Sequence, residues 1–114
     1  MVHGSTLNGG LKEDGTYDFH GFYAHLTEEI RAADIAVINQ ETILGGAEFP
    51  YSGYPRFNTP DAMGDAIVAA GFDVVLHATN HTMDKGAKGV ENCISFWETN
   101  YPDITVLGIF DSQE

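Results

Sequence analysis

The stretch "GFDVVLHATNHTMDKG", residues 71–86, decides the fold of this chain. Its first half is a continuous apolar run, which predicts a buried strand over residues 72–78. Its second half places an amide, an imidazole and a carboxylate close together, at Asn80, His81 and Asp84. Nothing in a folding argument requires these three side chains at a strand end, so their chemistry calls for a functional interpretation.

Outward from this stretch, helical and strand patterns alternate along the chain. Apolar spacing and helix-terminating residues predict helices over residues 17–33, 61–70 and 89–100. Continuous apolar runs predict strands over residues 35–39, 72–78 and 104–110; the first is expected to be buried on both faces, and the second to be buried. The order helix–strand–helix–strand–helix–strand predicts an α/β fold with a parallel sheet and covering helices. Residues 4–16 and 42–59, rich in turn formers, are expected to be loops.

Length and charge limit the classes of function. The 114 residues are expected to form one domain, residues 1–114, and the formal net charge is −12, from 17 acidic and 5 basic residues. This charge argues against nucleic acid or an anionic membrane as a partner. The sequence contains no run of about 18 apolar residues that could span a membrane and no signal-peptide pattern at its start. A single cysteine excludes an internal disulfide.

Two successive strands of the predicted sheet end in polar side chains. The first ends in "INQETI", which places Asn39 and Glu41 on one side of an extended segment, and the second is followed by Asn80, His81 and Asp84. In parallel sheets, ligands bind at the carboxyl ends of the strands. Carboxylate, amide and imidazole groups there are suitable ligands for a divalent metal, which would polarise a phosphoryl or carbonyl oxygen. A histidine beside it could protonate a leaving group, with Asp84 orienting its ring.

Each of these residues also has a structural interpretation. Glu41 alone could be a solvated carboxylate, and Asn80 a turn former. His81 alone could be a surface histidine, and Asp84 an N-cap of the following helix. His77, within the apolar run, is expected to be a hydrogen-bonded core histidine. The functional interpretation rests on two strand ends carrying such groups at one edge.

Three segments of the sequence resemble a known family: "ADIAVINQETILGG", "PRFNTPDAMGDAIVAAGFDVVLHATNHTMDKGAKGV" and "ITVLGIFDSQE". They resemble bacterial capsule synthesis proteins of the CapA, or poly-γ-glutamate synthesis (PGA_cap), type, which belong to the calcineurin-like metallophosphoesterase superfamily. The most specific elements are N-x-E after the first strand and N-H-x-x-D-x-G after the second. The resemblance extends over nearly the whole chain.

The resemblance implies a role for individual residues. Glu41 occupies the position of a metal-bridging carboxylate, Asn80 that of a ligand to a second metal, and His81 that of the residue that protonates the leaving-group oxygen. Asn39 and His3, the latter in "MVHG", join the expected metal-binding set. The implied cofactor is a divalent metal such as Mn, Fe, Zn or Mg, and the implied substrate is a phosphoester or an anionic polymer.

The resemblance is to part of a larger domain, because the family's first aspartate and its later histidine motifs have no counterpart here. We therefore expect a partial metallophosphoesterase-like sheet with little or no activity by itself, and either homo-oligomerisation or completion by further segments. The family also implies a location outside the cytoplasm. The alternative is a non-catalytic binding or assembly module of a cell-envelope polymer synthesis complex. In this module Tyr51, Tyr54, Arg56 and Phe57 could form a recognition surface, although these side chains could instead simply cover the sheet.

Overall fold

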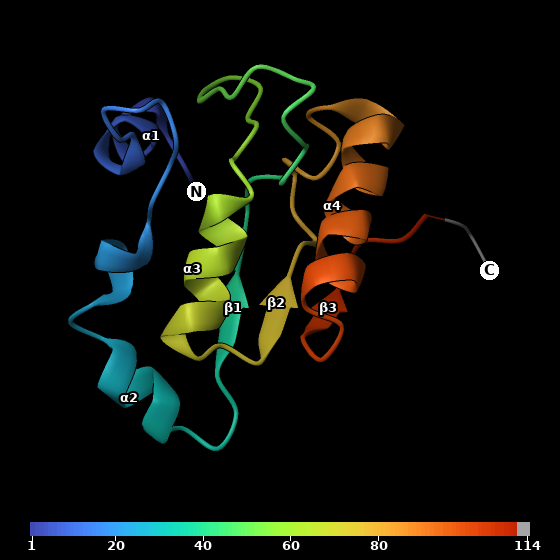
Figure 1. Cartoon of the computed structure of the whole chain (residues 1–114). Helices are drawn as coiled ribbons and strands as arrows, with labels where there is room; N and C mark the ends of the chain where they lie inside the picture. Colours follow the sequence, from blue (N-terminus) through green and yellow to red (C-terminus); the bar gives the residue numbers. More distant parts are fainter. Residues whose placement is uncertain (112–114) are drawn as a thin grey trace.

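A three-stranded parallel sheet forms the centre of the computed structural model, which describes residues 1–111 (Figure 1). Its strands are β1 (Val37–Asn39), β2 (Val74–Leu76) and β3 (Thr105–Leu107), in the order β1-β2-β3. The predicted α/β fold with a parallel sheet is therefore confirmed. Because all three strands run the same way, their carboxyl ends lie at one edge of the sheet, below the loop over residues 42–59.

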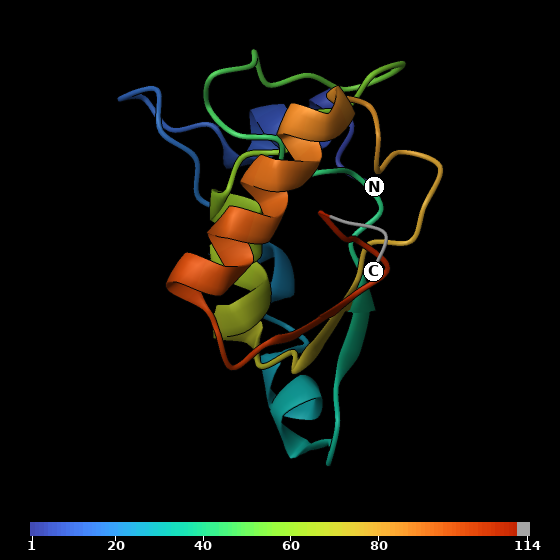
Figure 2. The same cartoon turned by 90° about the vertical axis from the view of Figure 1, so that its right-hand side faces the viewer.

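Two helices, α3 (Ala62–Ala70) and α4 (Gly86–Asn100), pack on one face of the sheet (Figure 2). The core lies between them and the central strand, where Ile67, Val75 and Trp97 are almost completely buried. Helix α3 ends at residue 70 as predicted, because the following glycine adopts a left-handed conformation with φ of 107°. Across residues 1–111, no helix is both long and apolar enough to cross a membrane.

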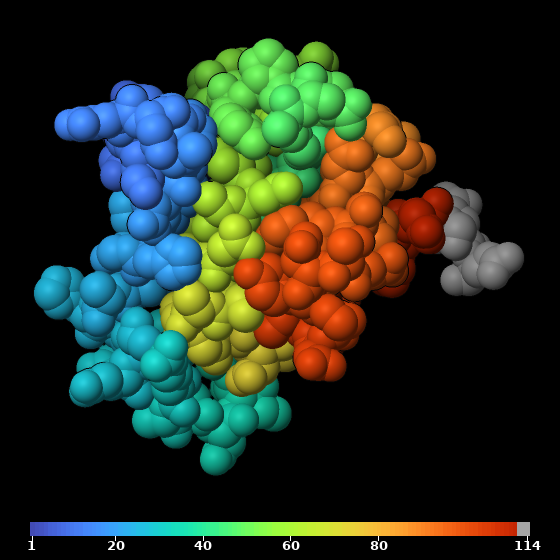
Figure 3. Space-filling view, in the orientation of Figure 1, coloured from blue at the N-terminus to red at the C-terminus, as the bar shows by residue number. Residues whose placement is uncertain are grey.

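The opposite face of the sheet is open, so the prediction that the first strand is buried on both faces was wrong. Val37 and Leu107 are 51% and 48% exposed, whereas Val75, which points to the helices, is fully buried. Helices lie on one side only, and in the space-filling view they hide the strands from the front (Figure 3). An apolar run shows that a strand can be buried, but it does not show how many layers cover it.

The segment before β1 differs most from prediction. The expected helix over residues 17–33 is two short helices, the 3-10 helix η1 (His20–Tyr23) and the α-helix α2 (Thr27–Ala32). The expected loop over residues 4–16 contains a further helix, α1 (Gly4–Gly10). Its last residue lies so close to the buried Phe19 ring that an added Cβ would be 2.2 Å from it. Tertiary packing here overrides the low helix propensity of glycine.

Candidate functional site at the carboxyl ends of the strands

The two strand ends that carry the predicted site residues are joined directly. The backbone N–H of Gln40 donates to the carbonyl oxygen of Leu76, 3.0 Å away, and continues the pairing of β1 with β2. One residue further on, the Thr79 hydroxyl donates to the carbonyl oxygen of Glu41 at 2.6 Å. The segments 39–41 and 79–81 therefore lie side by side at this edge of the sheet.

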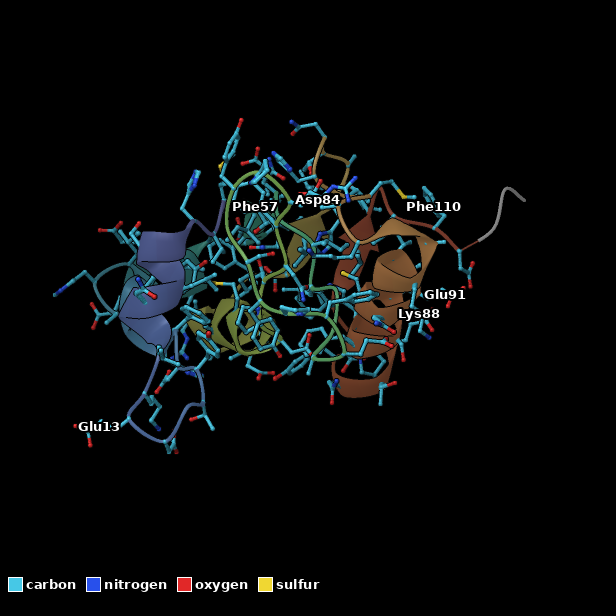
Figure 4. All side chains as sticks on the ribbon, turned by 90° about the horizontal axis from the view of Figure 1, so that it is seen from above. Glu13, Phe57, Asp84, Lys88, Glu91 and Phe110 are labelled. Carbon is cyan, nitrogen blue, oxygen red and sulfur yellow. The ribbon has the colours of Figure 1, made fainter. Side chains whose placement is uncertain are left out.

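His81 and Asp84 form a closely packed pair. Nδ1 of His81 is 2.7 Å from Oδ2 of Asp84, and the two side chains are only 15% and 13% exposed. The same carboxylate oxygen accepts a hydrogen bond from the backbone N–H of Phe57 at 2.7 Å. Figure 4 shows Phe57 and Asp84 close together in a view from above the strand ends. Asp84 does not cap α4, because Lys85 takes the N-cap position and no side chain caps that end.

These contacts fix the direction of the His81 ring. A carboxylate hydrogen-bonded to Nδ1 holds a proton on that nitrogen and leaves Nε2 as the nitrogen that can react. The Phe57 ring meets the His81 ring edge-on, with centroids 4.6 Å apart, and limits its rotation. The geometry therefore suits proton transfer through Nε2.

The amino-terminal segment reaches the same edge. The His3 and Phe57 rings lie edge to face with centroids 5.2 Å apart. The Val2 N–H donates to the hydroxyl of Thr42 at 3.3 Å, and the amino group of Met1 is 3.9 Å from a carboxylate oxygen of Glu41. Residues 1–3 thus form a third side of the candidate site.

The predicted metal ligands lie at the surface of this edge. Glu41 is partly buried, with its side chain 27% exposed, and Asn39, Asn80 and His3 are exposed. Within residues 1–111, no three His, Cys, Asp or Glu side chains are grouped closely enough to hold a metal ion. Glu41 and Asn80 offer the oxygen atoms that hard cations prefer, but a metal here would have few protein ligands. These side chains are therefore of the kind that binds a divalent cation, but there are fewer of them than a metal site normally has.

A buried polar cluster supports the site, and the sequence reasoning missed it. Asn58 is fully buried and holds the loop over residues 42–59. Its carbonyl oxygen accepts from the N–H of Gly45 at 2.8 Å, and its amide donates to the carbonyl of Gly46 at 3.0 Å. Next to it, the hydroxyls of Thr42 and Thr59 are 2.7 Å apart. A signal was present, since asparagine in a glycine-rich loop commonly satisfies backbone groups.

His77 is a core histidine, as expected. It is 1% exposed, and its Nε2 accepts a hydrogen bond from the indole N–H of Trp97 at 3.0 Å. Burial lowers the pKa of His77 to about 4, so the ring is neutral at pH 7. Burial likewise raises the pKa of the neighbouring Cys93 thiol to about 12, which leaves it protonated and unreactive.

The aromatic loop does not present all four residues of the expected recognition surface. Phe57 is fully buried beside His81, and Tyr51 packs edge-on against Tyr17 with ring centroids 5.4 Å apart. Tyr54, at 79% exposure, and Arg56 remain on the surface. The expectation was wrong for Phe57 because proximity in sequence does not determine which side chains of a folded loop point inward.

Comparison with known proteins gives the family. A model of the bacterial capsule synthesis protein PGA_cap matches residues 1–114. Two uncharacterized proteins of Sinorhizobium fredii (strain NBRC 101917 / NGR234), y4sH and y4uA, are each 30% identical to this chain over 78 residues. The alignment covers 62% of this chain and 17% of each relative, so it spans less than a fifth of their length. Because the family model matches it from end to end, this chain belongs to the bacterial capsule synthesis family PGA_cap.

Proposed function

We propose that this capsule-synthesis-type chain forms part of a metal-dependent phosphoesterase-like site. The observation that carries the proposal is the His81–Asp84 pair, held at 2.7 Å at the edge where Glu41 is joined to the neighbouring strand end. A positioned acid beside a carboxylate is the arrangement that phosphoester cleavage uses. A phosphoester or an anionic polymer is the substrate class.

His81 acts as the general acid in this proposal. Asp84 keeps the proton on Nδ1, so Nε2 is free to deliver a second proton to the leaving-group oxygen. The Phe57 ring and the backbone bond from Phe57 to Asp84 keep the pair in one orientation. Most of the proton-transfer geometry is therefore set before a substrate binds.

Glu41 and Asn80 would hold the divalent metal, with Asn39 and His3 nearby. When bound, the metal would polarise the phosphoryl oxygen and so favour attack on phosphorus. Within residues 1–111, the amino group of Met1 is the one positive group within ion-pair distance of the Glu41 carboxylate, at 3.9 Å, and this weak contact can give way to a metal. With so few protein ligands, we expect weak metal binding and low activity in this chain.

The test measures Mn²⁺ binding by calorimetry and Mn²⁺-dependent hydrolysis of bis(p-nitrophenyl) phosphate. Glu41→Gln should remove metal binding, and His81→Ala should remove hydrolysis while leaving metal binding intact. Glu13→Gln is the matched control, since Glu13 lies far from the site (Figure 4). The proposal is wrong if the chain neither binds Mn²⁺ nor hydrolyses the ester above the level of the two variants.

The open face of the sheet favours a second function, that of a non-catalytic assembly module. Val37 and Leu107 lie half-exposed on this face, and large exposed apolar side chains can mark an interface. In this alternative the face is buried against a second copy of the chain. Sedimentation velocity would then show association that Val37→Lys abolishes without lowering the melting temperature; a monomer at all concentrations would exclude it.

A further inference from the structure

Thr79 has a hydroxyl that contacts both sides of the candidate site. It donates a hydrogen bond to the carbonyl oxygen of Glu41 at 2.6 Å and accepts one from the backbone N–H of His81 at 3.1 Å. The first bond joins residues 38 positions apart, whereas the second lies within one turn. One side chain therefore fixes the backbone that carries the carboxylate relative to the backbone that carries the imidazole.

Within residues 1–111, no backbone hydrogen bond joins the two segments where Glu41 lies beside Thr79. The β1–β2 ladder ends with the bond from Gln40 to Leu76, and within residues 1–111 no backbone–backbone hydrogen bond joins Glu41 to residues 77–84. Beyond that point the strands would be free to separate. The Thr79 hydroxyl replaces the missing ladder bond where the site residues begin.

The surrounding loop keeps Thr79 in position. The hydroxyl of Thr82 accepts from the N–H of Thr79 at 3.2 Å, and it also contacts the carbonyl oxygens of His77 and Thr79. The backbone of the loop is thus braced by Thr82 as well as by the bond from the His81 N–H to the Thr79 hydroxyl. Its contact with Glu41 is an additional, long-range connection.

We propose that Thr79 is a positioning residue that sets the distance between the metal-binding carboxylate of Glu41 and the acid His81. The inference rests on the proposed function for its catalytic meaning. A residue at this position must both donate and accept with one short side chain, which serine and threonine can do. Valine has nearly the same shape and can do neither.

The experiment compares Thr79→Val with Thr79→Ser, and uses Thr105→Val as a control because Thr105 is exposed on the open face of β3. Mn²⁺ affinity of the whole chain is measured by calorimetry. We expect Thr79→Val to weaken Mn²⁺ binding about fivefold to tenfold, the loss that one or two neutral hydrogen bonds would cause. Thr79→Ser should restore the affinity to within about twofold. Unchanged affinity in Thr79→Val, with binding still lost in Glu41→Gln, would overturn the role of Thr79 and leave the proposed function standing.

A second readout does not depend on metal. In amide hydrogen exchange and ¹⁵N spectra, Thr79→Val should speed exchange of the His81 N–H and shift the resonances of Glu41 and Thr42, whereas Thr105→Val should do neither. If wild type binds no Mn²⁺ but these changes occur, the proposed function fails and the positioning contact survives. If the Glu41 resonances stay in place in Thr79→Val, the inference about Thr79 is wrong whatever the metal result.

Discussion

The two sides of the candidate site are built very differently. The acid side, His81 and Asp84, is mostly buried, and each side chain has at least two defined neighbours. The proposed metal side, Asn39 and Glu41, is more exposed, and the ion pair of its carboxylate is with the terminal amino group, 3.9 Å away. In the proposed site, this difference would preorganise proton transfer and leave the carboxylate available to a ligand. Four predictions test this contrast, from the largest effect to the smallest.

Removing the buried Asn58 amide should destabilise the loop that supports the His81–Asp84 side of the site. Asn58→Leu leaves the N–H of Gly45 without its acceptor and removes the amide bond to the carbonyl of Gly46, which retains the N–H of Phe49 at 3.4 Å. We expect the free energy of unfolding to fall by about 3 kcal/mol, since unsatisfied buried polar groups are costly. Urea denaturation followed by tryptophan fluorescence measures this loss. Ser52→Ala, which removes one exposed loop bond, is the control; equal losses in both variants would show that Asn58 has no special role.

Lowering the pH should destabilise the fold beneath the site through the buried His77. Burial lowers its pKa from 6.5 to about 4, so between these values the unfolded chain binds more protons than the folded one. Stability is therefore full above pH 6.5 and is lost as pH falls toward 4, by about 1–3 kcal/mol. Asp61, whose pKa is raised by burial and by Asp65, opposes this loss.

Chemical denaturation at a series of pH values measures this slope. His77→Gln should flatten it between pH 7 and pH 4.5, although the variant is itself less stable. His20→Gln should keep the slope, because His20 is exposed and makes its side-chain bond to Asp18. If the free energy of unfolding of His77→Gln keeps the wild-type dependence on pH, groups other than His77 cause that dependence.

Weakening the acid side alone should change catalysis more than stability. Asp84→Asn removes the carboxylate that orients His81, and we expect Mn²⁺-dependent hydrolysis to fall by roughly tenfold to a hundredfold, part of what a general acid contributes. ¹⁵N spectra should show the proton of His81 redistributed between Nδ1 and Nε2. Glu91→Gln, which breaks only an exposed contact with Lys88, is the control. An unaltered His81 tautomer would contradict the role given to Asp84.

The metal side should respond in the opposite way. Glu41→Gln should change the free energy of unfolding by less than about 0.5 kcal/mol, because a partly solvated pair at 3.9 Å contributes little. Its Mn²⁺ affinity should nevertheless fall at least tenfold. Thermal melting with and without Mn²⁺ gives both quantities in one series. A large loss of stability without metal would show that Glu41 is structural, and the contrast between the two sides would disappear.

Part of this site could be predicted from the sequence. Strand ends are local features, and a parallel sheet brings them to one edge, so the nearness of Glu41 and the segment after β2 followed from pattern alone. The partner of Asp84 stayed open between His81 and the start of the following helix, since both are compatible with its position in sequence, and the structure pairs it with His81. Asn58 and Thr79 were also missed, because hydrogen bonds between residues far apart leave no periodic signal.

By itself the sequence determined the order of the elements from β1 to β3, the parallel sheet and the polar residues at its carboxyl edge. Apolar periodicity and helix-terminating residues act over a few positions, and they can be recognised without knowing the fold. Tertiary structure alone decided that one sheet face stays open, that residues 17–33 form two short helices, and that "ATNHTMD" presents His81 braced by Asp84 and Phe57. These outcomes depend on contacts between distant segments, whose free energies outweigh local preference.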